Sequence, residues 1–122
     1  MKNKILVVDD EPDVNELLSV RLRNNGYEVF KARNGKEAIV IAVRENPDLI
    51  LLDILMPELD GAATAALLRE NPVTKAIPIV FITCLFTKED EAKGSIRGGT
   101  YFVAKPYDAD ELLKVVKENI RK

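Results

Sequence analysis

Acidic, hydroxyl and amino side chains stand at the ends of four short apolar runs in this sequence: Asp9 with Asp10, Asp53, Thr83 and Lys105. Taken singly, an aspartate after a strand is more often a helix cap, and a threonine or lysine there is usually just solvated. Capping alone does not explain three carboxylates, one hydroxyl and one ammonium together. An ionised carboxylate is costly to desolvate, so Asp53, which ends an almost wholly apolar run, needs cations or hydrogen-bond donors around it.

Metal-assisted phosphoryl transfer is the chemistry that fits these groups. Clustered acids in a chain with no histidine and one cysteine favour a hard cation bound through oxygen, most simply Mg²⁺. A carboxylate such as Asp53 can act as a nucleophile and form an acyl phosphate. The metal ion and an ammonium group would neutralise charge on the phosphoryl oxygens, and a hydroxyl could donate to the same oxygens.

Five apolar runs predict the strands that must position these residues. Runs this short, bounded by proline and polar residues, suit strands buried on both faces of a parallel sheet. We expect strands over residues 5–8, 27–32, 48–53, 78–83 and 101–104. Ligands bind at the carboxyl ends of the strands in open α/β sheets, so the polar residues would converge on one crevice.

Helical signals separate the predicted strands. Pro12 fits the first turn of a helix that Asn25 and Gly26 would stop. A second helix begins at Asn34, which with Glu37 three residues later resembles a capping box. The first of these helices has apolar residues at helical spacing: Val14, Leu17, Leu18 and Leu22.

Three more helices complete the pattern. Residues 62–70 are rich in alanine and leucine, whereas residues 87–97 are polar and weakened by glycine. Asp108 with Glu111 would cap a last helix. The apolar face of that helix is Leu112, Leu113, Val115, Val116 and Ile120. Strand and helix therefore alternate five times, which predicts an α/β fold, a doubly wound five-stranded parallel sheet with helices on both faces, as one domain over residues 1–122.

Composition excludes several classes of function. A net charge of −2 and the lack of a basic cluster argue against direct binding to nucleic acid or an anionic membrane. The single cysteine, Cys84, cannot form an intrachain disulfide, and the lack of histidine excludes Ser-His-Asp catalysis. The first apolar run is too short for a signal peptide or a membrane span, so we expect a cytoplasmic protein.

The whole chain resembles the response-regulator receiver domain of two-component signalling, like that of the chemotaxis response regulator. Each motif is weak alone, but in this order at strand ends the set is specific. The motifs are Val8-Asp9-Asp10-Glu11, Asp53-Ile-Leu-Met-Pro-Glu-Leu-Asp-Gly61, Ile82-Thr83 and Lys105-Pro106. The resemblance implies a flavodoxin-like fold of the receiver type.

The resemblance also implies a role for each site residue. Asp53 would be the phospho-acceptor. Asp10 would bind Mg²⁺ directly, Asp9 mostly through water, Asp53 through its own carboxylate and Leu55 through its backbone carbonyl. The remaining groups would contact the phosphoryl group: the ammonium of Lys105, the hydroxyl of Thr83 on activation, and the amides of Ile54 and Cys84.

Three positions depart from the usual family pattern. The switch aromatic, three residues before the lysine, is Phe102, which lacks the hydroxyl of the more usual tyrosine. Cys84 replaces a smaller residue and could narrow the path to Asp53. Residues 98–101 replace the more usual Gly-Ala-Asp-Asp, which affects the surface before the fifth strand.

The expected partners are a histidine kinase or a histidine phosphotransfer protein. An output domain or a second copy would bind the face formed by the fourth helix, the fifth strand and the fifth helix. We expect no nucleic-acid binding by this domain, no membrane contact, and no enzymatic activity beyond its own phosphorylation and slow dephosphorylation. We expect Met1 to be a natural start, but the sequence leaves open whether the chain stands alone or is part of a longer protein.

Three other functions compete with this one. A haloacid-dehalogenase-like phosphatase also uses a strand-end aspartate and Mg²⁺, but it needs an acid where this chain has Leu55. A flavodoxin-like cofactor binder is disfavoured because the acidic loop after Val8 would repel a flavin phosphate. A degenerate receiver that only docks to partners would not need the complete set of acids.

Overall fold

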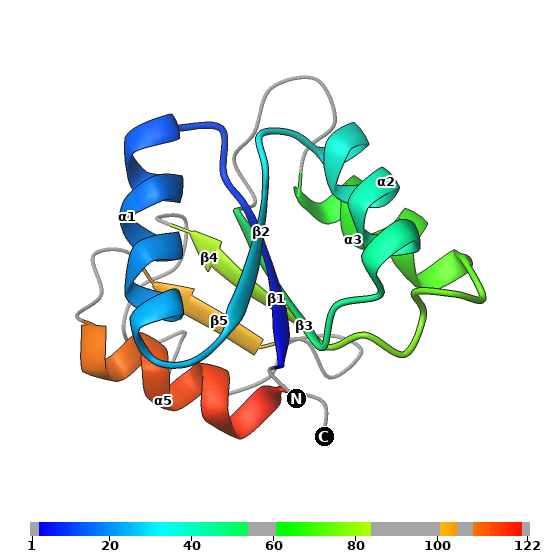
Figure 1. Cartoon of the computed structure of the whole chain (residues 1–122). Helices are drawn as coiled ribbons and strands as arrows, with labels where there is room; N and C mark the ends of the chain where they lie inside the picture. Colours follow the sequence, from blue (N-terminus) through cyan, green and yellow to red (C-terminus); the bar gives the residue numbers. More distant parts are fainter. Residues whose placement is uncertain (1–2, 54–60, 84–100, 105–108, 121–122) are drawn as a thin grey trace.

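The structure is a computed structural model, and it describes residues 3–53, 61–83, 101–104 and 109–120 (Figure 1). Five parallel strands form one sheet in the order β2-β1-β3-β4-β5. The strands are β1 (Lys4–Val8), β2 (Glu28–Ala32), β3 (Leu49–Asp53), β4 (Ile79–Thr83) and β5 (Tyr101–Ala104). The predicted parallel α/β sheet is thereby confirmed, with strand ends within two residues of those expected.

Helices cover both faces of the sheet (Figure 1). The described helices are α1 (Pro12–Asn24), α2 (Gly35–Glu45), α3 (Gly61–Glu70) and α5 (Ala109–Asn119). In Figure 1, α1 and α5 lie on one side of the sheet and α2 and α3 on the other. The helix predicted over residues 87–97 lies outside the described residues. No described helix is long and apolar enough to cross a membrane.

The central strands β1 and β3 contribute to two hydrophobic cores, one on each face of the sheet. Leu6, Val8, Ile50 and Leu52 pack with residues of α2 and α3. Their alternate neighbours pack with residues of α1 and α5: Ile5, Val7, Leu49 and Leu51. All eight side chains are essentially inaccessible, and full burial of each contributes about 1.5–3 kcal/mol. Two buried faces explain why these strands are apolar without alternation.

Helix α1 begins and ends as its sequence predicts, but its buried face differs. Pro12 is its first residue, and Gly26 follows its end with a φ of 92°, which favours glycine. Leu17, one of the four apolar residues at helical spacing, is not part of the buried face, since its exposed fraction is 63%. The buried positions recur at intervals of three and four residues: Asn15, Leu18, Ser19 and Leu22. Leu17 is displaced by about 100° from Leu18 around the helix, so it faces solvent.

The other helices agree with their sequence signals. The Asn34 side chain caps α2 by accepting a hydrogen bond of 2.9 Å from the amide of Glu37. Only this half of the predicted capping box forms, because the Glu37 carboxylate accepts from the amide of Arg33 at 3.1 Å instead. The predicted apolar face of α5 packs on the sheet. The predicted cap of α5, Asp108, lies outside the described part of the chain.

Candidate functional site

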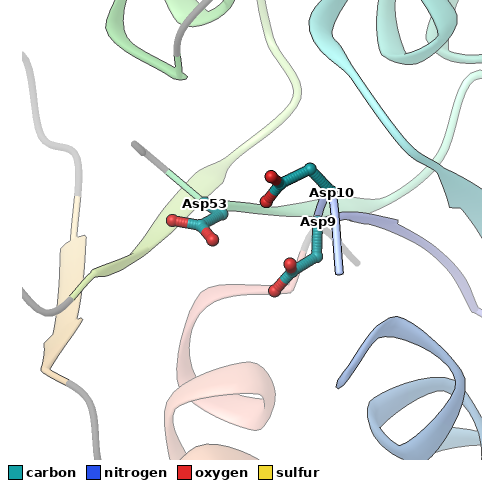
Figure 2. A group of neighbouring side chains, drawn as sticks. All are labelled: Asp9, Asp10 and Asp53. Atoms are coloured by element: carbon teal, nitrogen blue, oxygen red, sulfur yellow. The ribbon is translucent and has the colours of Figure 1, made fainter. Parts of the chain in front are cut away.

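Three carboxylates gather where β1 and β3 end. Asp9 and Asp10 directly follow β1, and Asp53 is the last residue of β3. These two strands are neighbours, and Val8 lies opposite Leu52, so the three aspartates follow at the same edge of the sheet. One carboxylate oxygen of each aspartate lies within 4.8 Å of those of the other two (Figure 2). Of the polar residues expected to converge at this edge, the three aspartates do so in the folded chain.

The aspartates differ in burial. Asp9 and Asp53 are only 4% and 5% exposed, whereas Asp10 is partly exposed. The carboxylate of Asp9 accepts a hydrogen bond of 3.0 Å from the amide of Glu11, the residue that precedes α1. This short turn directs the chain from the strand into the helix and orients Asp9.

The donor set fits a hard divalent cation. Three carboxylates held this close repel one another, and a cation bound between them would relieve that repulsion. The groups offer only oxygen ligands, which suits Mg²⁺ rather than a softer metal.

The backbone brings the next predicted site residues to adjacent strand ends. Thr83 is the last residue of β4, and it lies opposite Ala104 of β5. Lys105 follows Ala104 in the sequence but lies outside the described residues, as do Leu55 and Cys84. Ile54 also lies outside them, and only the strand positions of Thr83 and Phe102 are described.

Two buried polar residues beneath the aspartates were missed in the sequence. Asn15, 3% exposed, donates from Nδ2 to the carbonyl oxygens of Asp9 at 3.2 Å and Ala32 at 3.0 Å. Ser19, fully buried, donates to the carbonyl oxygen of Asn15 at 2.7 Å. The signal that could have found this pair is its helical spacing with Leu18 and Leu22, which places it on the core face of α1.

An ion-pair network lies on the exposed side of α1. Glu16 pairs with Lys31 of β2 and, at 3.9 Å, with Arg23. The hydrogen bond from Lys31 holds the pKa of the Glu16 carboxyl below its usual value, aided by the positive charges of Lys31 and Arg23. Because these side chains are exposed, solvent screens the interaction and it adds little stability.

Comparison with known proteins identifies the family. The model of the response regulator receiver domain matches residues 5–117. This chain belongs to the response regulator receiver domain family. Receiver domains are the phospho-accepting signalling modules of two-component systems and are generally not classed as enzymes. They interact with histidine kinases and with output domains.

Individual receivers resemble the chain over nearly its whole length. The DNA-binding dual master transcriptional regulator RpaA of Synechocystis is 34% identical over 119 residues, which are 98% of this chain. The match covers 49% of that regulator, so the chain spans about half its length. The crystallised chemotaxis protein CheY4 of Vibrio cholerae superposes with a TM-score of 0.87 at 30% identity, covering 98% of this chain and 100% of CheY4.

One structural relative bears on the metal. The receiver domain of a sensor histidine kinase from Pseudomonas aeruginosa superposes with a TM-score of 0.82 at 26% identity, and each chain is covered to 97%. That domain holds a magnesium ion coordinated in its active-site cleft.

Proposed function

We propose that residues 1–122 form one receiver domain that accepts a phosphoryl group on Asp53 from a histidine kinase or a histidine phosphotransfer protein. Transfer depends on Mg²⁺ and changes the face that binds partners. The observation that carries the proposal is the approach of the Asp9, Asp10 and Asp53 carboxylates to within 4.8 Å of one another. Asp53 stands at the carboxyl edge of a parallel sheet, where α/β folds bind ligands.

Asp53 is the nucleophile in this proposal. One of its carboxylate oxygens attacks phosphorus, the bond from phosphorus to the donor imidazole nitrogen breaks, and an acyl phosphate forms on Asp53. The imidazole leaves with the electron pair of the broken bond. Lys105 pairs with the phosphoryl oxygens, and Thr83 donates its hydroxyl to one of them after transfer.

The metal would be held by this chain's own oxygens. Asp10 and Asp53 would bind it through their carboxylates, Asp9 mostly through water, and Leu55 through its carbonyl oxygen. When bound, Mg²⁺ neutralises charge on the phosphoryl oxygens and on the three carboxylates. The magnesium ion in the related Pseudomonas receiver domain supports this assignment.

The rest of the proposal concerns partners and place. The domain acts only on its own phosphoryl group, in its phosphorylation and slow dephosphorylation. Its output partner, or a second copy of the domain, binds the face formed by the helix predicted over residues 87–97, by β5 and by α5. The cytoplasmic location expected from the sequence stays a prediction.

Phosphorylation by acetyl phosphate in the presence of Mg²⁺ tests the proposal, with intact-protein mass as the readout. The wild type should gain one phosphoryl group, and chelation of Mg²⁺ should prevent this. Asp53→Asn should gain none. Asp48→Asn is the matched control, because it makes the same change just before the start of β3 and should be labelled as well as the wild type. Undiminished labelling of Asp53→Asn would overturn the assignment, and no labelling of the wild type would favour a receiver that only docks.

A further inference from the structure

The side chain of Asn15, on α1, hydrogen-bonds to the backbone at the ends of β1 and β2, next to the three aspartates. Its Nδ2 donates to the carbonyl oxygen of Asp9 at 3.2 Å and to that of Ala32 at 3.0 Å, with a longer contact to that of Val7 at 3.5 Å. Asp9 also donates from its own amide to Ala32 at 3.1 Å. The Ala32 carbonyl therefore joins the residue after β1 to the end of β2, and Asn15 joins both to α1.

The position of Asn15 is itself fixed. The backbone N–H of Asn15 donates to the carbonyl oxygen of Glu11 at 3.0 Å within the first turn of α1. Ser19 donates to the carbonyl oxygen of Asn15 at 2.7 Å and approaches its Oδ1 at 3.3 Å. Asn15 and Ser19 are nearly inaccessible to water, so their polar atoms depend on these partners. The side-chain amide is thereby oriented toward the strand ends.

The three aspartates repel one another, and the hydrogen bonds around Asn15 oppose the effect of that repulsion on the backbone. Asp9 and Asp10 follow the last residue of β1, and their carboxylates approach a third one, that of Asp53. Repulsion tends to move the Asp9–Asp10 segment away from Asp53. The bonds from Asn15 and from the Asp9 amide hold the Asp9 peptide against that force.

We propose that Asn15 is a positioning residue for the metal ligands: it holds the Asp9 peptide so that the carboxylates converge before a divalent cation binds. This inference rests on the proposed Mg²⁺ site. A ligand set that is already in place binds metal more tightly, because less order has to be imposed on binding. Groups that orient metal ligands typically change metal affinity by about 10–100-fold when they are replaced.

A purely structural role would predict something different. Loss of buried hydrogen bonds would lower the thermal stability of the variant and leave the affinity of the folded protein for Mg²⁺ unchanged. Thr74 provides the matched control, because its buried hydroxyl donates to the carbonyl oxygen of Leu68 at 2.6 Å. It lies between α3 and β4, where the chain approaches the amino ends of the strands, opposite the edge that carries the aspartates.

The experiment is calorimetric titration of the purified protein with MgCl₂, at a temperature where every variant is folded by circular dichroism. Asn15→Leu keeps the approximate side-chain size but removes the donor, and we expect its Kd for Mg²⁺ to rise roughly tenfold. Asn15→Ser is the milder variant, because a serine hydroxyl can bond within its own helix but does not reach Ala32. It should weaken binding in the same direction. Thr74→Val should lower the Tm and leave the Kd unchanged.

The possible failures can be told apart. Equal Kd values for the wild type and both Asn15 variants would overturn the positioning role and leave the Mg²⁺ site intact. A similar loss of affinity in Thr74→Val would also overturn it, since general destabilisation would then explain the effect. A wild type that binds no Mg²⁺ would overturn the proposed site and this inference together.

Discussion

Asp53 lies opposite Ile82 across the β3–β4 pair, so Thr83 lies one residue farther toward the carboxyl edge of the sheet. Thr83 in turn lies opposite Ala104 at the end of β5. Asp53, Thr83 and Ala104, the residue before Lys105, therefore lie at the ends of three neighbouring strands, β3, β4 and β5. Thr83 therefore lies between Asp53 and β5 in the order of the strands.

The first prediction is that Thr83→Ala separates phosphoryl binding from switching. We expect beryllofluoride with Mg²⁺ to change amide exchange in the wild type over residues 87–97 and in β5, because Thr83 moves to the phosphoryl group and biases a two-state change. Thr83→Ala should still bind beryllofluoride through Asp53 but lose most of this change. Hydrogen exchange followed by mass spectrometry is the measurement. If protection in the wild type changes only around α1, the proposed output face is wrong.

The second prediction concerns the lifetime of the acyl phosphate. The family resemblance places the residues two beyond the acceptor and two beyond the threonine beside the path of the attacking water, and here both are leucines, Leu55 and Leu85. Neither can orient or deprotonate water. A side chain that orients or deprotonates water typically raises the reaction rate by about 10²–10⁴-fold, and an open site gives only part of this factor. The double variant Leu55→Asn with Leu85→Glu should therefore speed the decay of the acyl phosphate by roughly tenfold.

Loss of phosphate from purified phosphoprotein in Mg²⁺ measures that lifetime. The wild type should decay slowly, on a timescale suited to transcription or a relay rather than to motility. A wild-type half-life of seconds, or no acceleration in the double variant, would contradict the role of the leucines without affecting Asp53.

The third prediction concerns charge in the aspartate cluster. Asp10→Asn removes one of three negative charges within 4.8 Å, so the metal-free protein should become more stable by roughly 1–3 kcal/mol. Mg²⁺ should raise the Tm of the wild type, and this increase should be much smaller in the variant. Thermal unfolding with EDTA and with MgCl₂ gives both values. Asp13→Asn, the same change at an exposed site in the first turn of α1, should not stabilise the metal-free protein.

The fourth prediction concerns the other edge of the sheet. The Asp48 carboxylate accepts from the amide of Lys4 at 2.9 Å, and the Asp48 amide donates to the carbonyl oxygen of Lys4 at 2.7 Å. Asp48→Ala should lower the free energy of unfolding by about 1–2 kcal/mol, because it removes the acceptor of a charge-assisted hydrogen bond. Urea unfolding measures the loss. Asp48→Asn keeps an acceptor oxygen and should lose less, and an equal loss in both variants would argue against this bond as the cause.

Local signals predicted most of the fold. Apolar runs identified the strands, and Pro12, Gly26 and Asn34 set helix ends through the chemistry of their own backbone neighbourhood. The strand ends then brought Asp9 and Asp53 together through the general rule for parallel sheets.

Pairwise contacts across the fold could not be predicted in the same way. Asn15 and Ser19 are polar, and polarity on a helix usually indicates exposure, yet both are buried whereas the apolar Leu17 is exposed. Their burial depends on the Ala32 carbonyl, which lies 17 residues beyond Asn15 in the sequence. A pattern of residue types does not contain that information.

The two-sided burial of β1 and β3 leaves their alignment undetermined by hydrophobicity. If β1 slid by two residues along β3, each of its side chains would still point toward the same pair of helices, so the alternation of faces does not by itself fix the alignment. Polar partners at the two ends exclude such a slip, because it would separate Lys4 from Asp48 and Asp9 from Ala32. The alignment of the apolar strands is therefore encoded by the few polar groups that frame them, and Asp9 serves both that alignment and the proposed site.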